Sequence, residues 1–495
     1  MVDLLDRFLD VAARHGDRVA VRTRTGDTSF AELATLAGKF ATRFSAIPSP
    51  KVLVAYDQGL DAYAAMLGTM LAGGFYAPIN VSAPREKVAA ICKSFQPALI
   101  VGDESVLSEL SEVAPQAVRI GLPEIHAADA FQRKAARHSI AYVMFTSGST
   151  GEPKGVVISH AALAHYLDWV IDSGLFQATD RVSQNTNIAF DVSVLDIFGA
   201  LCAGAMIVPF VSRGDRLMPA EGIHEHAITV WVSTPTAVSV MMRLKQLTSK
   251  NLASVRRFFF VGEPLLETHV NAIFSACPAA EIWNAYGPTE ATVTVTCLKM
   301  TAGSYASAVT TSVAFGTAIP GMELHVLGGD SAEEGELVIV GPQLAEGYWN
   351  DPEQTARAFR TVDFSGTPKR AYFSGDWVRV SKGHVYFQSR IDQQVKIDGF
   401  RLELGEVAAA IRSLGWNEVV VMKLNGQLTA IIENKAHIDA ALIEKELHGR
   451  LQLKLEHYAM PSRFVSVEEF PRNLNDKIDL KALAKLAESQ SRAST

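Results

Sequence analysis

The sequence predicts an α/β protein with a large N-terminal multi-layer α/β domain and a small C-terminal α+β domain. Its 495 residues exceed one ordinary hydrophobic core, so two or more domains are expected. From the N-terminus to beyond residue 230, short apolar runs alternate with helical patterns, which is typical of layers with parallel strands. From Glu336 the pattern changes to closely spaced strand-like runs, and a separate compact unit follows residue 392.

The N-terminal part shows the alternation of strand and helix most clearly. Residues 60–72 space Ala, Met and Leu as one face of a helix does, and Gly73 and Gly74 end that helix. Apolar runs of strand length lie on either side of it and recur further along the chain. These runs are residues 51–55, 75–78, 98–101 and 229–232.

The C-terminal part has the pattern of a small domain of ordinary size, about 100 residues. Asp398-Gly399 and Asn425-Gly426 each lie between strand-like runs, and both dipeptides are strong signals for a hairpin turn. Residues 440–451 have helical spacing, and residues 463–467 form a last strand-like run. The expected organisation is an N-terminal domain over residues 1–388, a hinge over 389–392 and a C-terminal domain over 393–495.

Composition and charge exclude several classes of protein. The net charge of −7 argues against a nucleic-acid binder, whose surface would be basic. The four cysteines show no CxxC pair, so they indicate neither a zinc site nor a disulfide framework. The N-terminal segment carries acids where a signal peptide is apolar, and no apolar run approaches the roughly 20 residues of a membrane span. We therefore expect a cytoplasmic enzyme with no membrane and no nucleic-acid partner.

A run of glycines and hydroxyl-bearing residues at 146–155 follows an apolar strand-like segment. Glycines let backbone N–H groups turn toward an anion, hydroxyls add donors, and Lys154 adds a positive charge. The run therefore predicts a loop that binds a polyphosphate. It is not a Walker A loop, because Pro153 precedes the lysine and Gly155 follows it. A simple connecting loop is the alternative, which four hydroxyls, three glycines and one lysine disfavour.

Further motifs follow this loop in a recognisable order. Residues 284–290 combine an aromatic ring, a tight turn, a hydroxyl and a carboxylate, and residues 373–376 present an acid directly after a strand-like run. Other motifs lie at residues 335–348, 390–392, 396 and 475–479. Together they resemble the core motifs of the adenylate-forming superfamily, whose members are acyl-CoA synthetases, firefly-type luciferases and nonribosomal peptide synthetase adenylation domains. The resemblance covers residues 140–480.

The resemblance implies a reaction in two steps. A substrate carboxylate attacks the α-phosphorus of ATP and forms an acyl-adenylate and pyrophosphate. A thiol then takes the acyl group and releases AMP. In phosphoryl chemistry of this kind the protein mainly positions groups and stabilises charge, so ATP and Mg²⁺ are the expected cofactors.

The resemblance also assigns ATP contacts to individual residues. Glu290 is the expected ligand of Mg²⁺, directly or through water, and Thr289 contacts the α-phosphate. Tyr286 packs on the adenine, Asp376 accepts hydrogen bonds from the ribose hydroxyls, and Arg390 adds a ribose or phosphate contact. The alternatives are that Tyr286 is a plain core residue and that Arg390 forms a surface ion pair. The expected ATP-binding set is Thr146, Ser147, Gly148, Ser149, Thr150, Gly151, Lys154, Asn284, Ala285, Tyr286, Gly287, Thr289, Asp376, Arg390 and Lys477.

Members of the superfamily rotate the small, mobile domain about a hinge between the two half-reactions. Asp392 aligns with that hinge. Lys477 is expected to bridge the substrate carboxylate and the α-phosphate during adenylation, and Lys396 and Gly399 line the path of the thiol after rotation. The expected catalytic residues are Lys477, Glu290, Thr289 and Lys154. The chain departs from the family pattern at Ser389, at Asp476 and at residues 455–456.

Residues 190–196 resemble the motif of the members that activate amino acids. There Asp191 binds the α-ammonium group, because a carboxylate in a pocket forms a charge-assisted hydrogen bond and rejects acids that lack the ammonium. The alternative is that Asp191 caps the following helix, as Ser193 equally could. The pocket implied by the family is Asp191, Val192, Leu195, Val232, Phe259, Val261, Ala285, Val293, Thr294 and Lys477.

Between its aspartate and its lysine, this pocket has Thr294 as its only polar side chain. Burial of a charged or strongly polar substrate side chain there would be costly. The expected substrate is therefore a small or medium neutral amino acid, with D-alanine, L-alanine, proline and valine as candidates.

Segments 232–236, 260–263 and 286–296 resemble the D-alanine:D-alanyl carrier protein ligases in particular. Those ligases have cysteine at or near the position of Val261, so the configuration of the substrate stays open. No carrier domain follows residue 480, so the expected acceptor is the phosphopantetheine thiol of a separate carrier protein.

Two other functions remain open. A coenzyme A ligase for a small organic acid would show no pyrophosphate exchange that depends on an amino acid. An adenylate-sensing or scaffold module would have no need for the complete set of Lys154, Glu290, Asp376 and Lys477.

Overall fold

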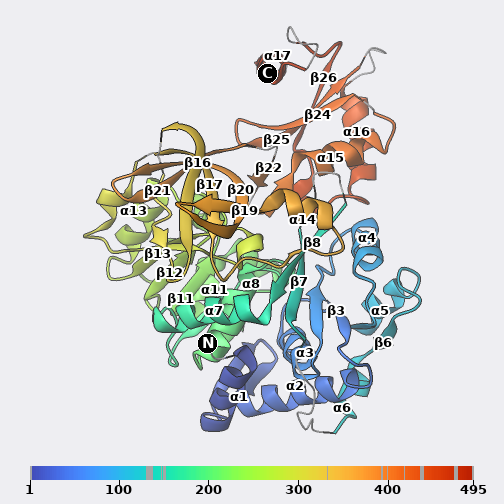
Figure 1. Ribbon diagram of the computed structural model, residues 1–495, viewed down its shortest axis with the longest axis vertical. Coiled ribbons are helices and arrows are strands. Elements are labelled where there is room, and N and C mark those ends of the chain that lie inside the picture. Colours follow the sequence, from blue (N-terminus) through green and yellow to red (C-terminus); the bar gives the residue numbers. More distant parts are fainter. Residues whose placement is uncertain are drawn as a thin grey trace. The chain divides into compact units, whose positions relative to one another are not determined.

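The computed structural model divides into two compact units, whose elements are labelled in Figure 1. The first contains Met1–Val81, Cys92–Phe145 and Gly155–Ile391, and the second contains Ser82–Ile91, Thr146–Lys154 and Asp392–Thr495. The residues that the structure describes are 3–129, 138–146, 148, 152–310, 312–331, 333–391, 394–397, 400–416, 418–434, 440–472 and 478–492. No sequence pattern indicates that 82–91 and 146–154 belong with the C-terminal part, and the predicted hinge stays a prediction.

A seven-stranded sheet in the first unit has the order β18-β8-β7-β4-β3-β5-β6. Its interior strand β3 runs parallel to β4 and β5, and residues 52–55 within it are fully buried. Gly74 permits the close turn into β4, because a Cβ there would lie 2.2 Å from the Pro50 carbonyl oxygen. The strands are β3 (Lys51–Ala55), β4 (Phe75–Pro78), β5 (Leu99–Gly102), β6 (Val118–Ile120), β7 (Ile140–Thr146), β8 (Lys154–Ser159) and β18 (Gly347–Tyr348).

A nine-stranded sheet carries most of the candidate site and has the order β15-β14-β13-β12-β11-β9-β10-β1-β2. Alternate residues of its central strands face two different buried clusters. Val232 and Phe259 pack into one, and Trp231 and Phe258 into the other, so this part of the sheet is covered on both faces. The strands are β1 (Val19–Thr23), β2 (Gly26–Ser29), β9 (Arg181–Gln184), β10 (Met206–Pro209), β11 (Val230–Ser233), β12 (Arg257–Phe260), β13 (Glu281–Tyr286), β14 (Thr296–Met300) and β15 (Thr317–Ala318).

Helices connect and cover these strands (Figure 1), and all of them belong to the first unit except α4, whose residues up to Ile91 are assigned to the second. Helix α2 begins at a capping box, in which the Ser29 hydroxyl accepts from the Glu32 N–H and the Glu32 carboxylate accepts from the Ser29 N–H. The helices are α1 (Leu4–Arg14), α2 (Phe30–Phe44), α3 (Leu60–Leu71), α4 (Arg85–Phe95), α5 (Glu104–Leu110), α6 (Leu122–His126), α7 (His160–Asp172), α8 (Val192–Val194), the π-helix η1 (Leu195–Gly199), α9 (Ala200–Cys202), α10 (Arg213–Leu217), α11 (Pro219–Glu225), α12 (Pro235–Arg243), α13 (Glu267–Ala276), the 3₁₀ turns η2 (Thr289–Ala291) and η3 (Tyr305–Ala308), and α14 (Pro352–Ala358). No helix among the described residues is long and apolar enough to cross a membrane.

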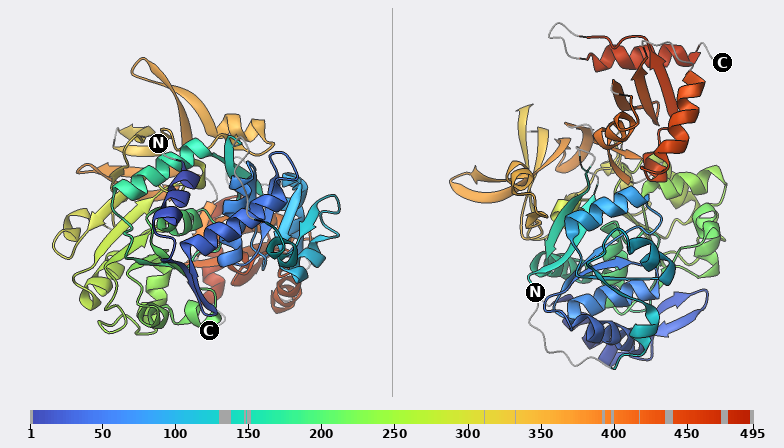
Figure 2. Two further views of the ribbon diagram at one scale, coloured as in Figure 1. Left: turned by 90° about the horizontal axis from the view of Figure 1, so that it is seen from below. Right: turned by 90° about the vertical axis from the view of Figure 1, so that its right-hand side faces the viewer.

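A five-stranded antiparallel sheet forms the strand-rich part that the sequence predicts after Glu336. Figure 2 shows it to one side of the two larger sheets. Its strands are β16 (Glu323–Ser331), β17 (Glu334–Val340), β19 (Phe359–Phe364), β20 (Thr367–Ser381) and β21 (His384–Arg390). Strand β20 pairs with β17, β19 and β21, so it joins the sheet together.

The C-terminal part of the second unit combines helices and strands, as the sequence predicts. Its hairpin turn at Asn425-Gly426 has both residues at positive φ, 50° and 82°, as the favoured two-residue turn requires. The helix predicted at 440–451 and the strand predicted at 463–467 are confirmed, whereas Asp398-Gly399 lies outside the described residues. The elements are β22 (Gln394–Ile397), β23 (Phe400–Glu403), α15 (Leu404–Arg412), β24 (Val419–Leu424), β25 (Gln427–Glu433), α16 (Ala440–Leu451), η4 (His457–Ala459), β26 (Arg463–Val467) and α17 (Leu480–Arg492).

Candidate active site

Three neighbouring parallel strands, β11, β12 and β13, carry expected pocket residues near their carboxyl ends. Val232 on β11 lies opposite Phe259 on β12, and Ala285 is the penultimate residue of β13. Val261 follows β12 directly, and its N–H donates to the Ser233 carbonyl oxygen. In open α/β sheets ligands bind outside the carboxyl ends of the strands. Six expected pocket residues belong to the same large buried core: Leu195, Val232, Phe259, Val261, Ala285 and Val293.

Asp191 immediately precedes α8 and is partly exposed. Within the described residues its side chain makes no hydrogen bond that caps this helix, and the Ser193 hydroxyl donates to the Ile188 carbonyl oxygen at 3.2 Å. The alternative of a side-chain cap is therefore wrong, while the ammonium-binding role stays a prediction. At Leu195 the chain enters the π-helix η1, a wider turn that often occurs at functional sites and that the sequence pattern does not reveal.

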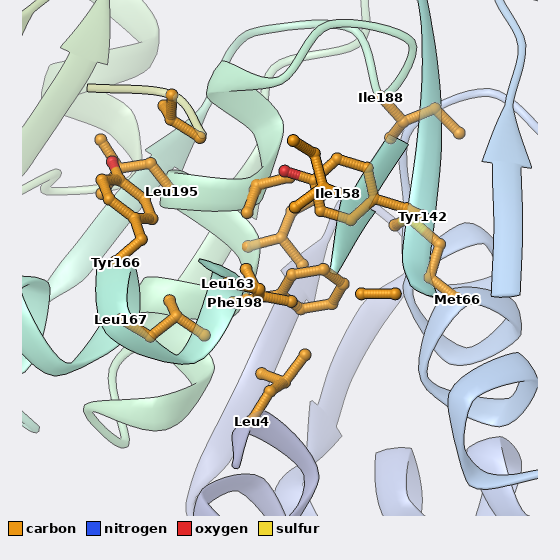
Figure 3. Close-up of a cluster of buried hydrophobic side chains, with 14 of the residues drawn as sticks. Leu4, Met66, Tyr142, Ile158, Leu163, Tyr166, Leu167, Ile188, Leu195 and Phe198 are labelled. Carbon is orange, nitrogen blue, oxygen red and sulfur yellow. The ribbon is translucent and has the colours of Figure 1, made fainter. Parts of the chain in front are cut away.

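Tyr166 on α7 adds a polar group to this region that the sequence analysis missed. Figure 3 shows its ring beside Leu195. Burial raises the pKa of Tyr166 well above its ordinary value, and the neighbouring Thr294 hydroxyl opposes that shift. In the described part of the chain, neither of these hydroxyls makes a well-aligned hydrogen bond. The pocket region thus holds a second hydroxyl beside the predicted Thr294.

Tyr286, Asp376 and Arg390 come together at the end expected to bind the nucleoside. The Tyr286 hydroxyl donates to Oδ2 of Asp376 at 2.5 Å, and Nη1 of Arg390 donates to Oδ1 at 2.7 Å. Nη2 of Arg390 also donates to the Ser374 carbonyl oxygen at 3.0 Å. The Tyr286 ring stacks on Phe315 with centroids 4.3 Å apart. Burial, reinforced by the charge of Asp376, raises the pKa of Tyr286 well above its ordinary value.

This geometry bears on two alternatives, namely that Arg390 forms a surface ion pair and that Tyr286 is a plain core residue. Arg390 does form an ion pair, but the pair is not on the surface, because the side chains of Arg390 and Asp376 are only 11% and 5% exposed. Tyr286 is buried as a core residue would be, and it also positions Asp376. Asn284 donates from its amide to the Ala314 carbonyl oxygen at 2.9 Å, so it fixes the backbone next to Phe315.

Glu290 lies in the 3₁₀ turn η2 and is fully buried. The Tyr348 hydroxyl donates to its Oε1 at 2.8 Å, which orients the carboxylate. Among the described residues, no group of three or more His, Cys, Asp or Glu side chains is placed to hold a metal. A single carboxylate fits Mg²⁺, which commonly takes one or two protein ligands and completes its octahedron with phosphate oxygens and water.

Several expected site residues lie in the second unit or outside the described residues. Thr146 and Lys154 flank the loop that is expected to bind phosphate, and the Lys154 ammonium lies 3.9 Å from Oε1 of Glu403 in the same unit. Lys396 lies on β22, where its carbonyl oxygen accepts from the Lys423 ammonium. The expected site residues outside the described part are Ser147, Ser149, Thr150, Gly151, Asp392, Gly399 and Lys477.

Comparisons with known proteins agree with this arrangement. The family model described as AMP-binding enzyme matches residues 8–349. The chain belongs to the AMP-binding enzymes. This AMP-binding enzyme is an ATP-dependent adenylating ligase, which confirms the superfamily resemblance and the predicted class of enzyme.

Relatives resemble this AMP-binding enzyme over its full length. The D-alanine--D-alanyl carrier protein ligase of Staphylococcus aureus strain MRSA252 is 30% identical, over 98% of this chain and 99% of that protein. The protein of the same name from Lactococcus lactis subsp. lactis strain IL1403 is 29% identical, over 97% and 98%.

Solved structures confirm the fold class. The adenylation domain AlmE of Vibrio cholerae, in complex with glycyl-adenosine-5'-phosphate, matches with a TM-score of 0.84 and 27% identity over 98% of each chain. The nonribosomal peptide synthetase protein PA1221, which contains adenylation and PCP domains, matches with a TM-score of 0.79 and 25% identity over 97% of this chain and 84% of that one. The large N-terminal and small C-terminal parts of this AMP-binding enzyme are thus those of an adenylation domain.

Proposed function

We propose that this enzyme activates a small or medium neutral amino acid as its aminoacyl-adenylate and transfers it to the phosphopantetheine thiol of a separate carrier protein. The observation that carries the proposal is the set of buried apolar side chains near the carboxyl ends of β11, β12 and β13, with Asp191 on the segment that leads into α8. The names of the full-length relatives, D-alanine--D-alanyl carrier protein ligase, support both the amino acid and the carrier.

The pocket supports a neutral substrate side chain. Val232, Phe259 and Val293 are all buried and apolar, so a lysine or glutamate side chain among them would lack a partner. An aromatic side chain would compete for space with Phe259 and Leu195. D-alanine, L-alanine, proline and valine remain the candidates, and the structural relative with bound glycyl-adenosine-5'-phosphate adds glycine to the amino acids that need testing.

The adenylation step forms a bond between the substrate carboxylate oxygen and the α-phosphorus of ATP, and the bond to pyrophosphate breaks. In our proposal Asp376, held by Tyr286 and Arg390, accepts hydrogen bonds from the ribose hydroxyls. Glu290, oriented by Tyr348, would hold Mg²⁺, which supplies positive charge to the phosphate oxygens when bound.

The remaining roles rest on the family motifs. Lys154 and the hydroxyls of the 146–151 loop would hold the β- and γ-phosphates, and Thr289 would contact the α-phosphate. Lys477 would stabilise the charge that develops between carboxylate and α-phosphate. In the second step the carrier thiolate attacks the acyl carbonyl carbon and AMP leaves, with Asp392 as the hinge and Lys396 and Gly399 along the thiol path.

The test combines ATP–pyrophosphate exchange with carrier loading. The enzyme is incubated with ATP, Mg²⁺, one amino acid and a carrier protein in its phosphopantetheinylated form, and the carrier mass is measured. An increase by one aminoacyl group supports the proposal, with the apo carrier as the control. Exchange that requires no amino acid, together with loading of coenzyme A by a simple organic acid, would instead identify an acyl-CoA synthetase.

A further inference from the structure

Two β-branched residues next to each other have an unusual backbone conformation. Thr292 and Val293 both lie in the left-handed region, with φ of 56° and 67°. Such angles are uncommon for β-branched side chains, and they persist only where the surrounding structure holds them. Val293 and Thr294 belong to the expected amino-acid pocket, so whatever holds this backbone also shapes the pocket wall.

The side chain of Gln343 holds this loop. Its side chain is fully buried, and its Nε2 lies 3.2 Å from the Ala291 carbonyl oxygen, 3.4 Å from that of Thr292 and 2.9 Å from that of Thr294. In return, the Thr292 hydroxyl donates to the Gln343 carbonyl oxygen at 2.7 Å. One amide group therefore contacts three carbonyl oxygens within residues 291–294.

His165 fixes the orientation of this amide. Because the three carbonyl oxygens can only accept, the group facing them is the NH₂, and Oε1 of Gln343 must accept elsewhere. Nδ1 of His165 lies 3.0 Å from that oxygen, so it carries the proton and donates. The ring itself is confined, since a Cβ at Gly321 would come within 2.5 Å of its Nε2.

The same segment also fixes the beginning of the loop. The Ala345 N–H, two residues after Gln343, donates to the Glu290 carbonyl oxygen at 2.8 Å. At the other side Gly287 packs tightly on the loop, because a Cβ there would lie 2.5 Å from the Val293 carbonyl oxygen. The loop is thus held between residues 343–345 on one side and Gly287 on the other. It links Glu290, which faces the phosphates in our proposal, to the wall of the amino-acid pocket.

We propose that Gln343, oriented by His165, is a positioning residue that holds residues 291–294 in the shape that presents Val293 and Thr294 to the amino acid. The effect on amino-acid recognition rests on the proposed function. The support of residues 291–294 rests on the geometry alone. Gln343 acts through the loop and touches no reacting atom, so it should affect recognition of the amino acid more than binding of ATP.

The test replaces Gln343 by leucine, which has similar volume and no amide. We expect the KM for the amino acid to rise by about 10-fold, the equivalent of one to two lost hydrogen bonds, with the KM for ATP changed less than about twofold. Gln246→Leu is the matched control, because Gln246 is also a buried amide, and its side chain bonds to Leu217, Met218 and Ala220, none of which belongs to the expected site. It should reduce stability without changing either KM.

Hydrogen–deuterium exchange of the peptide covering 289–296 gives a readout that needs no activity. The N–H groups of Thr294 and Val295 are hydrogen-bonded within this region, so they should exchange faster in Gln343→Leu and keep their rate in Gln246→Leu. If Gln343→Leu does not fold, His165→Phe replaces it, since this change keeps a ring and leaves Oε1 of Gln343 without its donor. It should produce smaller shifts in the same direction.

The two measurements separate the possible failures. If the wild-type enzyme shows no pyrophosphate exchange that depends on an amino acid, the proposed function is refuted, and so is the role of Gln343 in substrate recognition. Hydrogen–deuterium exchange would still show whether Gln343 holds residues 291–294 in place. Unchanged deuterium exchange in Gln343→Leu would overturn the role in the loop. Faster deuterium exchange in Gln343→Leu with an unchanged KM for the amino acid would overturn the role in substrate positioning. Equal increases in the KM for the amino acid and the KM for ATP would overturn it as well.

Discussion

Asp376 is held from both sides, since Oδ2 accepts from the Tyr286 hydroxyl at 2.5 Å and Oδ1 accepts from Arg390 at 2.7 Å. The carboxylate is buried and belongs to a strand, so its position depends on rigid elements rather than on a loop. This arrangement joins an aromatic ring, a carboxylate and a guanidinium that come from three separate motifs in the sequence.

Asp376→Ala should raise the KM for ATP and lower stability together. Removing one partner of a buried ion pair costs about 3–5 kcal/mol, because Arg390 would stay buried without its counter-charge. Urea unfolding and the ATP dependence of pyrophosphate exchange measure the two effects. Asp27→Asn is the control, since its pair with Arg22 is exposed and should contribute at most about 1 kcal/mol. Equal effects of the two changes would contradict a special role for Asp376.

Asp191→Ala should raise the KM for the amino acid steeply and leave the KM for ATP nearly unchanged. Loss of a partner for a buried ammonium costs roughly 3–5 kcal/mol, which corresponds to a factor of several hundred or more. Ser193→Ala is the matched control, because Ser193 lies two residues further on, in α8, and its hydroxyl donates to the Ile188 carbonyl oxygen. An Asp191→Ala enzyme with the wild-type amino-acid KM would exclude the ammonium contact.

Lys477→Ala should slow adenylation by about 100- to 1000-fold, the usual effect of removing one group that stabilises transition-state charge. Transfer to the carrier from a supplied aminoacyl-adenylate should remain largely intact, because the lysine acts only in the first half-reaction of our proposal. Lys481→Ala, an exposed lysine on α17, is the control. Equal loss in both half-reactions would contradict the assignment of Lys477 to one of two states.

Glu281 should make stability depend on acid pH. Burial alone would raise its pKa, but hydrogen bonds from Lys299, Arg257 and Trp283 outweigh burial and lower the pKa to about 2. A depressed pKa in the folded state means that the stabilisation is full above the ordinary value of 4.5 and is lost as the pH falls toward 2. The difference in unfolding free energy between wild type and Glu281→Gln should therefore shrink over this range. A difference that is constant between pH 5 and pH 3 would contradict the ion-pair account.

The regular elements could be predicted from local signals. Gly73 marks the end of α3, and Asn425-Gly426 marks the hairpin between β24 and β25, because these residues adopt positive φ angles that few other residue types adopt. The strands at 98–101 and 229–232 were placed one residue too early, since an apolar run does not show where hydrogen bonding ends.

The contacts between distant motifs could not be predicted in the same way. Gln343 and Tyr348 lie inside a motif that the sequence analysis used, yet nothing in their spacing shows that they reach Thr292 and Glu290. Tyr166 has the spacing of an ordinary core residue on α7. The π-helix at Leu195 was also missed, because one inserted residue leaves the apolar pattern of a short helix unchanged.

The central claim is that this AMP-binding enzyme activates a small neutral amino acid, and ATP–pyrophosphate exchange over a panel of amino acids tests it most directly. The panel contains glycine, both configurations of alanine, proline and valine, and lysine, glutamate and tryptophan. We predict the strongest exchange with a member of the first group, because Val232, Phe259 and Val293 leave no partner for a charge and little space for a large ring. Exchange strongest with lysine, glutamate or tryptophan would contradict the pocket, and exchange without any amino acid would contradict the function.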